Sequence, residues 1–268
     1  MSTIDILVIS LKTAVSRRDH QIRQASALGL TIEFVDAIQA GLLSAVECQR
    51  AVNRWTRPLQ AKDIACYHSH RTAWAVVVQR QRPCVILEDD VLLHRDIQGV
   101  LQTIQHKGMA QDEAYDLEFV PRPHTLSRSA SWTSENFCAR RIYENRNGLG
   151  AYVIGPNVAQ RMLNESTDFA LIDAFFWNRR WLQAYQVEPA VAVQMVYHPS
   201  SEAYGTVDQL PAQAVVYAPE SFWRSRYVSI RNELRKVPSI LRGALRGVPR
   251  RIQFDATAFT LRSQDDCS

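Results

Sequence analysis

The sequence predicts an α/β fold built on a parallel sheet, and three observations predict it. Residues 4–9 (IDILVI) and 31–35 (TIEFV) are short apolar runs rich in β-branched residues, as in buried strands. The segment between them is mostly polar, and its apolar residues recur at the spacing of a helix. The segment stops at Gly29, and glycine is the residue type that most often follows a helix end. Strand, helix and strand with short connections form a βαβ unit, whose strands are parallel.

The chain after this unit keeps alternating between the two kinds of element. Helices are predicted over 43–53 and 64–78, and Pro83 ends the second. Residues 84–87 (CVIL) form a continuous apolar run, which is typical of a buried parallel strand. The remaining predictions are a helix over 97–106, a strand over 115–120, a long mobile loop over 121–136, a strand over 150–154, a helix from 156 to about 163, a helix over 172–183 and a last strand over 187–193.

Composition narrows the class of protein. Of 268 residues, 46% are apolar, which is enough to bury a large core and excludes a disordered or fibrous chain. No run approaches the roughly 18 apolar residues of a membrane-spanning helix. The apolar run at the start is short and Asp5 interrupts it, so we expect no signal peptide and a cytoplasmic location. The five cysteines include no C-x-x-C pair, which argues against a disulfide framework and a zinc–thiolate site.

Charge is distributed unevenly along the chain. Residues 221–262 hold ten Lys or Arg and two acids, a charge of +8. The formal total is +4, so the rest of the chain carries −4. An acidic body with a basic tail is typical of an enzyme with an electrostatic anchor rather than of a nucleic-acid-binding protein. We therefore divide the chain into a catalytic domain, 1–220, and a basic tail, 221–268.

Three adjacent carboxylates, Glu88, Asp89 and Asp90, follow the predicted strand 84–87 directly. Ligands of open α/β sheets bind at the carboxyl ends of the strands. Adjacent carboxylates repel one another, and a hard cation such as Mg²⁺ or Mn²⁺ relieves that repulsion while bridging to a substrate phosphate. The cluster therefore predicts a cation beside a phosphorylated substrate. The alternative is a solvated acidic turn.

Two histidines lie on the predicted helix 64–78. His68 and His70 are two positions apart, so they do not face each other and do not form a joint metal site. The functional interpretation is that one of the two histidines points into a cleft. The alternative is that each is a structural histidine held by hydrogen bonds.

These segments resemble glycosyltransferase family 25, the bacterial lipopolysaccharide and lipooligosaccharide glycosyltransferases, of which collagen galactosyltransferases are distant relatives. The matching motifs occur in order over residues 4–194: VISL at 8–11, Arg17-Arg18, IACYHSH at 64–70 followed by Trp74, LEDDV at 87–91, NGLGAYVIG at 147–155, LID at 171–173 and a P-x-V-x-Q-like element at 189–194. Ser10 stands where the family usually has Asn, and Ala65 where it has Gly. Neither departure removes a charge or a metal ligand. Residues 108–146 match little, so the acceptor is the least defined part of the prediction.

The resemblance implies a GT-A fold, in which a Rossmann-like nucleotide-binding half is fused to an acceptor-binding half. It implies inverting transfer of a sugar, galactose from UDP-galactose, with Mn²⁺ or Mg²⁺, to a lipopolysaccharide, lipooligosaccharide or other glycan acceptor. Under this interpretation Asp90 is a direct metal ligand, and Glu88 contacts the metal or the ribose. The remaining donor-site candidates are Asp89, Ser10, Arg17, Arg18, Ser69 and His70. For the two arginines, the alternative is a solvated helix face.

Inverting transfer needs a general base on the acceptor hydroxyl. Asp173 is the predicted base, because it precedes the aromatic run FFW at 175–177 and aromatic faces stack on sugars. The alternative is that Asp173 caps a helix.

Two other classes of function compete with this one. A metal-dependent nucleotidyl- or phosphotransferase also uses carboxylates beside a strand, but the chain has no glycine-rich phosphate loop. The other is a non-catalytic nucleotide-sugar-binding protein of the same fold, and the intact acidic cluster argues against it.

The basic tail has the pattern of an amphipathic helix. Its apolar stripe is Tyr227, Ile230, Leu234, Val237, Leu241, Leu245 and Val248, with Pro238 predicted to divide it into two helices. Such a helix binds the surface of an anionic membrane, which places the enzyme peripherally on the inner leaflet of the inner membrane. Packing of the stripe on the enzyme or on a second subunit is the alternative. The sequence leaves the oligomeric state open.

Overall fold

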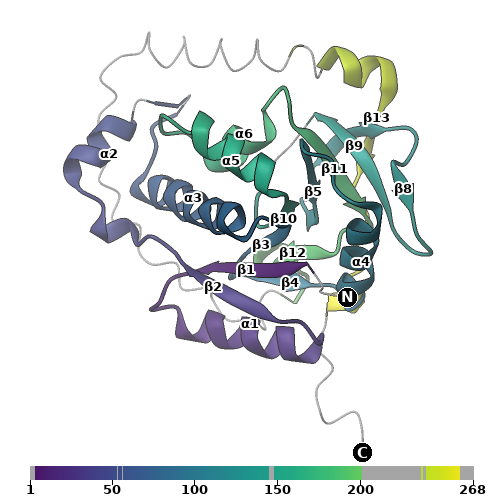
Figure 1. Cartoon of the computed structure of the whole chain (residues 1–268), viewed down its shortest axis with the longest axis horizontal. Coiled ribbons are helices and arrows are strands. Elements are labelled where there is room, and N and C mark those ends of the chain that lie inside the picture. Colours follow the sequence, from purple (N-terminus) through teal and green to yellow (C-terminus); the bar gives the residue numbers. More distant parts are fainter. Residues whose placement is uncertain are drawn as a thin grey trace, which may run out of the picture.

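The computed structural model describes residues 4–52, 54–55, 57–144, 148–200, 237 and 240–259. The strands in these ranges form a ten-stranded mixed sheet and a separate three-stranded sheet. Helices cover both faces of the large sheet (Figure 1).

The predicted βαβ unit is confirmed. Strand β1 (Asp5–Ser10) pairs in parallel with β2 (Ile32–Asp36) on one side and with β3 (Cys84–Glu88) on the other. Helix α1 (Val15–Ala27) connects β1 to β2. Its end is closed by Gly29 at φ +62°, where the Leu30 amide donates to the Ala25 carbonyl at 2.8 Å. Gly29 is favoured there because an L side chain rarely adopts that backbone conformation.

Beyond β3 the sheet is mixed rather than parallel. The order of its main strands is β13-β7-β9-β11-β5-β10-β3-β1-β2, and the short strand β8 also pairs with β9. The β5–β11 pair is parallel, whereas β10 runs antiparallel to both β3 and β5. The bounds are β5 Glu113–Asp116, β7 Pro123–Ser127, β8 Trp132–Thr133, β9 Cys138–Glu144, β10 Ala151–Ile154, β11 Gln183–Glu188 and β13 Gly247–Arg251.

Alternating side chains divide the core into two layers. Leu7 and Ile9 of β1 pack toward α3 (Ala61–Arg80), α5 (Pro156–Glu165) and α6 (Ile172–Trp177). Ile6 and Val8 pack on the opposite face, toward α4 (Ile97–Lys107) and the end of α1. Because both faces of β1 and β3 are covered, residues 6–9 and 84–87 of these strands are all apolar, as the sequence predicts. The short elements η1 (Ala40–Leu42) and α2 (Ala45–Val52) precede α3.

The small sheet lies directly after the acidic cluster. It consists of β4 (Val91–Leu93), β12 (Ala192–Gln194) and β6 (Glu118–Phe119), in that order. Strand β4 starts one residue after Asp90, and Val91 is paired with Gln194. The sheet therefore brings Glu118 and Gln194, distant in sequence, next to the end of β3.

Several predicted elements are wrong in detail. Residues 121–136 are not one loop, because β7 and β8 lie within them; His124 and Leu126 alternate inward and are fully buried. The predicted strand 115–120 is divided between β5 and β6, which belong to different sheets. The helix predicted over 172–183 ends at Trp177, and residue 183 already belongs to strand β11, which pairs with β5 and β9. The last predicted strand is two strands, β11 and β12, and β13 follows later in the chain.

Only part of the predicted tail falls within the described residues. Residues 240–246 are helical, with Leu241 and Leu245 exposed, but Val248 lies in β13 rather than on a helix. Strand β13 pairs with β7, and Ile252 is buried in the main core. Tyr227, Ile230, Leu234 and Pro238 lie outside the described residues, and the domain division at residue 220 stays a prediction. Among the described residues, no helix is both long enough and apolar enough to cross a membrane.

Candidate active site

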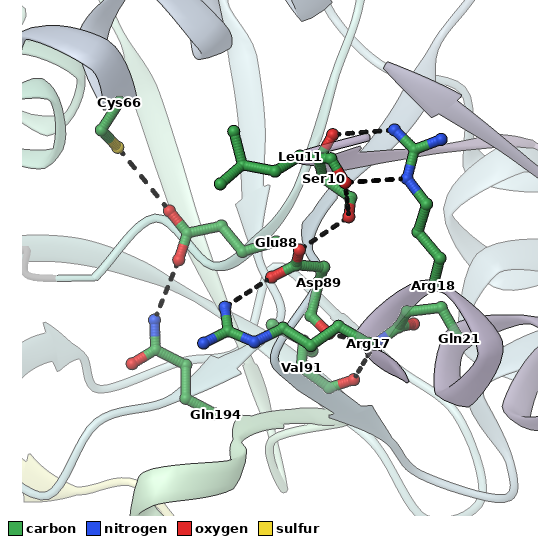
Figure 2. A network of polar contacts seen from close by, with 10 residues as sticks. All are labelled: Ser10, Leu11, Arg17, Arg18, Gln21, Cys66, Glu88, Asp89, Val91 and Gln194. Atoms are coloured by element: carbon green, nitrogen blue, oxygen red, sulfur yellow. Dashed lines mark hydrogen bonds and ion pairs between the residues drawn. The ribbon is translucent and has the colours of Figure 1, made fainter. Parts of the chain in front are cut away.

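The three carboxylates lie where β3 ends, and two of them point in different directions. Glu88 is the last residue of β3, and its side chain extends toward Cys66 and Gln194. Asp89 extends toward Ser10 and Arg17 (Figure 2). The cluster is therefore divided between two polar networks, as expected for successive residues leaving a strand.

Asp89 is held by the first of these networks. Its Oδ2 accepts a hydrogen bond from Ser10 Oγ at 2.7 Å, and its Oδ1 lies 3.0 Å from Arg17 Nη1. The buried Gln21 side chain donates to the carbonyls of Asp89 and Val91 at 3.1 and 2.8 Å. Three groups from β1 and α1 thus fix the position of the acidic turn.

Arg18 has a different environment from Arg17. Its guanidinium donates to the carbonyls of Ser10 and Leu11 and pairs with Asp36 at 2.8 Å. It also lies over the Phe34 ring, 4.6 Å from the centroid. Arg18 therefore joins the carboxyl ends of β1 and β2. Neither arginine is a purely solvated helix residue.

Both arginines lie in the first turn of α1, which is the positive end of the helix dipole. Cations are unfavourable at that position unless anions compensate for them. Asp89 compensates Arg17 and Asp36 compensates Arg18. Backbone amides and two guanidinium groups at one helix start form a favourable environment for an additional anion.

Glu88 belongs to the second network. Its Oε1 lies 3.3 Å from His70 Nε2 and 3.8 Å from Cys66 Sγ, and its Oε2 accepts from Gln194 Nε2 at 3.2 Å. Burial raises the pKa of Glu88, but the hydrogen bond and charge of His70 and the bonds from Cys66 and Gln194 outweigh it. The net pKa lies below the ordinary value, so Glu88 stays ionised.

His70 is fully buried and contacts Glu88 of β3 through one ring nitrogen and Tyr152 of β10 through the other. Its Nδ1 lies 2.9 Å from the Tyr152 hydroxyl, which accepts a hydrogen bond from Trp74 Nε1 at 2.9 Å. The chain Trp74–Tyr152–His70–Glu88 therefore orients one carboxylate from the centre of α3. Because His70 contacts Glu88 directly, it is a positioning residue for the site.

The neighbours of His70 on α3 have other partners. Ser69 Oγ donates to the Ala65 carbonyl at 2.7 Å and accepts from the Ile38 amide at 2.9 Å, so it links α3 to the segment after β2. His68 lies 2.7 Å from Glu47 on α2. The two histidines therefore pair with different elements, His68 with α2 and His70 with β3.

Asp90 has the feature most typical of a ligand site. Its Oδ1 is buried and has no hydrogen-bond partner among the described residues. Burial, followed by the charges of Glu88 and Asp89, raises the pKa of Asp90 to about 7. An unpaired buried carboxylate oxygen of this kind is stabilised by a cation, which replaces the missing donors and lowers the pKa.

Glu118 lies beneath this cluster and is also acidic. Its Oε2 accepts from the Gly150 amide at 2.8 Å, and burial, together with the charges of Asp116 and Glu88, raises its pKa well above the ordinary value. A Cβ at Gly148 would lie 2.6 Å from Glu118 Oε2, and Gly148 has φ +79°. Glycine is therefore required where the loop before β10 crosses this carboxylate.

Asp173 lies in the first turn of α6, near enough to Glu88 for the charge of Glu88 to affect its pKa. Burial raises its pKa, hydrogen bonds from the Ala174 and Gly148 amides lower it, and the charge of Glu88 raises it again. The net pKa is above the ordinary value, which makes the Asp173 carboxylate a stronger base than an exposed aspartate. The N-cap residue of α6 is Leu171, so Asp173 is not the cap.

Sequence reasoning gave no role to three residues that contact this site. Gln194 holds Glu88, Tyr152 orients His70, and Cys66, which the sequence suggested only as a reduced core thiol, contacts Glu88. All three lie within the quoted motifs. Pairing of β10 with β3 places Tyr152 opposite Ile86, and pairing of β12 with β4 places Gln194 opposite Val91, close to the end of β3.

Residues 3–177 match the family described as glycosyltransferase family 25 (LPS biosynthesis protein). The lipooligosaccharide biosynthesis protein lic2B of Haemophilus influenzae is 25% identical over 265 residues, covering 91% of each chain. Among solved structures, a glycosyltransferase involved in glycosylation of the major capsid of PBCV-1 has a TM-score of 0.40 and 11% identity, covering 76% of this chain and 97% of that one. A mannose-1-phosphate geranyltransferase of Thermus thermophilus has a TM-score of 0.33 and 8% identity, covering 70% and 74%.

Proposed function

Because this chain belongs to glycosyltransferase family 25, we propose that it transfers galactose from UDP-galactose, with inversion, to a lipopolysaccharide or lipooligosaccharide glycan. Glycosyltransferase activity follows from the family. The donor sugar, the stereochemistry, the metal and the acceptor are the parts that we propose.

One observation carries the proposal most directly. The buried, unpaired Asp90 Oδ1 lies beside ionised Glu88 at the carboxyl end of β3. This is the end of an α/β sheet at which ligands bind. The residues therefore fit a divalent cation, and Asp90 and Glu88 would hold Mn²⁺ or Mg²⁺. The cation would neutralise negative charge on the diphosphate leaving group.

The start of α1 supports binding of the donor diphosphate. Arg17 contributes a guanidinium whose partner, Asp89, is itself fixed by Ser10. Planar guanidinium groups and helix N-termini both favour phosphate oxygens. Asp89 and Ser10 position Arg17, and Arg18 keeps the ends of β1 and β2 together. His70 and Ser69 act on the donor site indirectly, through Glu88 and through the segment after β2.

Asp173 is the proposed general base. Its raised pKa makes it a better proton acceptor near neutral pH than an exposed aspartate. The charge of Glu88 raises the pKa of Asp173, and the charge of Asp173 raises the pKa of the Cys66 thiol, so an acceptor hydroxyl at Asp173 would be near the donor site. Trp177 Nε1 donates to the Gly148 carbonyl at 2.6 Å. This bond connects α6 to the loop whose Gly148 amide donates to Asp173.

The basic tail is proposed to hold the enzyme on the cytoplasmic face of the inner membrane, where the acceptor would be available. Val237, Leu241 and Leu245 are 43%, 60% and 77% exposed, and Arg242 and Arg246 are exposed beside them. Exposed apolar side chains interleaved with arginines suit an anionic lipid surface.

The test is release of nucleotide from a panel of nucleotide sugars, with and without Mn²⁺ and with a truncated lipooligosaccharide acceptor. We expect UDP release that requires the cation, prefers UDP-galactose and increases with acceptor. Transfer of a phosphoryl or nucleotidyl group instead of a sugar would contradict the proposal. Equal turnover after chelation would contradict the metal assignment alone.

A further inference from the structure

A second set of metal-binding atoms lies beside the acidic cluster. Cys66 Sγ, His70 Nε2 and a Glu88 carboxylate oxygen all lie within 4.8 Å of one another. Glu88 Oε1 is 3.3 Å from the histidine nitrogen and 3.8 Å from the sulfur. Zinc binds nitrogen and oxygen at about 2.0–2.1 Å and sulfur at about 2.3 Å, so tetrahedral ligand atoms lie roughly 3.3–3.8 Å apart. The two separations from Glu88 Oε1 fall in this range.

These ligand atoms are positioned by the fold rather than by flexible surface side chains. Cys66 and His70 are four positions apart on α3 and therefore lie on one face of the helix. His70 is fully buried, and Glu88 ends the buried strand β3. Little side-chain freedom remains to be lost when a metal binds.

The groups around His70 also suit a metal ligand. The Tyr152 oxygen accepts a hydrogen bond from Trp74 and has a second lone pair for a proton on His70 Nδ1. When a metal replaces the hydrogen bond between Nε2 and Glu88, the imidazole keeps its proton on Nδ1 and binds the metal through Nε2. A hydrogen bond to the far nitrogen is the usual support of a metal-binding histidine.

We propose that Cys66, His70 and Glu88 form a binding site for a thiophilic divalent cation, Zn²⁺, distinct from the Asp90 site. Binding forms a bond from the metal to each of the three atoms and releases two protons to solvent, the thiol proton of Cys66 and the Nε2 proton of His70 that bonds to Glu88. The thiolate and imidazole select Zn²⁺ over Mg²⁺ and Mn²⁺, which prefer oxygen ligands. Three protein ligands leave a fourth coordination position for water.

Zn²⁺ binding at this site would affect activity. This effect rests on the proposed function, whereas Zn²⁺ binding itself does not. Glu88 belongs to both the Zn²⁺ site and the proposed Mn²⁺ site. Zinc at Cys66 would withdraw Glu88 from the donor site, so Zn²⁺ is an inhibitor of Mn²⁺-supported transfer.

The binding test uses the full-length protein, stripped of metal, with Zn²⁺ and with Co²⁺ as its spectroscopic substitute. We expect one equivalent of either metal to bind, and Co²⁺ to give a near-ultraviolet thiolate-to-metal charge-transfer band. Cys66→Ser should abolish the band. Cys138→Ser, at another partly exposed free thiol, and Cys267→Ser should retain it. A wild-type protein without the band, or a band that persists in Cys66→Ser, would overturn the site.

A second variant tests the support of His70. Tyr152→Phe removes only the hydroxyl and should weaken Zn²⁺ binding about 10–100-fold, as is typical for loss of a hydrogen bond to a metal-binding histidine. Unchanged affinity in a folded Tyr152→Phe protein would contradict the role of Tyr152. In transfer assays, Zn²⁺ inhibition should weaken in Cys66→Ser, and equal inhibition in both proteins would contradict the link to Glu88. Protein that binds Zn²⁺ but transfers no sugar would leave this site standing and overturn the proposed function.

Discussion

Ser10, the last residue of β1, donates a 2.7 Å hydrogen bond to Asp89, the first residue after β3. The two residues are 79 positions apart in the chain, and both are buried. This bond joins the carboxyl ends of two neighbouring parallel strands at the candidate active site. It also explains why the residue at position 10 must be polar.

Ser10→Ala should lower the free energy of unfolding by about 1–3 kcal/mol, because Asp89 keeps its burial but loses a donor. Urea unfolding of both proteins measures the difference. Ser16→Ala, on the exposed side of α1, is the matched control and should change stability little. Equal stability of wild type and Ser10→Ala would show that Arg17 alone holds Asp89.

Asp90→Asn should abolish transfer and leave the apo protein as stable as wild type or more stable. The substitution removes a proposed metal ligand and also the repulsion from Glu88 and Asp89 that raises the Asp90 pKa. Transfer assays and thermal unfolding with and without Mn²⁺ measure both effects, with Asp19→Asn as an exposed control. Near wild-type transfer with the same Mn²⁺ response would show that Asp90 does not bind the metal.

Asp173→Asn should lower the transfer rate by about 10²–10⁴ while donor affinity changes little, because the amide keeps the shape but takes no proton. Asp168→Asn is the matched control: Asp168 is half-exposed and pairs with Arg54 at 3.1 Å. A third or more of the activity remaining in Asp173→Asn would exclude it as the base, and Glu118 would become the next candidate.

His124 predicts how stability depends on pH. Both of its ring nitrogens are buried without a partner among the described residues, and burial lowers its pKa from 6.5 to about 4. Between these two values the unfolded chain binds a proton that the folded chain excludes, so stability falls as the pH falls. Above pH 6.5 the effect vanishes, and below about 4 it stops growing.

The measurement is urea unfolding of wild type and His124→Leu at pH 7.5 and pH 5. The wild type should lose about 2 kcal/mol more than the variant over this interval. The same loss in both proteins would assign the pH dependence to other groups.

The tail predicts binding to anionic membranes at low salt. Replacing Arg242 and Arg246 by Gln removes two charges, worth about 1 kcal/mol each, so partition to such liposomes should fall roughly thirtyfold. Liposome sedimentation measures it, and Arg23→Gln/Arg50→Gln, at two exposed arginines elsewhere, is the charge-matched control. Nucleotide release in solution should be unaffected. Wild-type protein that ignores anionic liposomes at low ionic strength would favour packing of the stripe against protein.

Truncation at residue 221 is not a suitable test of the tail. It would remove β13 and the buried Ile252 together with the helical residues. Loss of the fold would then be indistinguishable from loss of an anchor, which is why point substitutions are needed.

The sequence predicts the first half of the sheet well, for a physical reason. Strands β1 and β3 are covered on both faces, so their apolar runs are uninterrupted and bounded by polar turns. Helix α1 is followed by Gly29, which has a positive φ, and a glycine at that place in the sequence predicts the helix end. These signals are local, and each depends on one segment of the chain.

The second half depends on pairing between distant segments. Residues 123–127 (PHTLS) are strand β7 because β9 and β13 lie on either side, and neither neighbour is visible from that segment. Likewise the acidic residues are marked in the sequence, whereas Gln194 reaches Glu88 only because β12 pairs with β4. The candidate site is therefore predictable in its charges and not in its hydrogen-bond partners.

The position of β13 late in the sequence also determines when the sheet can be completed during translation. Gly247 pairs with Ser127, a separation of 120 residues, so β7 has no partner on that side until translation reaches the end of the chain. Such long-range pairings form slowly, and an unpaired strand edge is a template for aggregation. Pro249 within β13 provides no backbone N–H, which suits its place at the edge of the described sheet. A nascent chain released before residue 247 would therefore carry an open β7 edge, and self-association rather than inactivity would be its first defect.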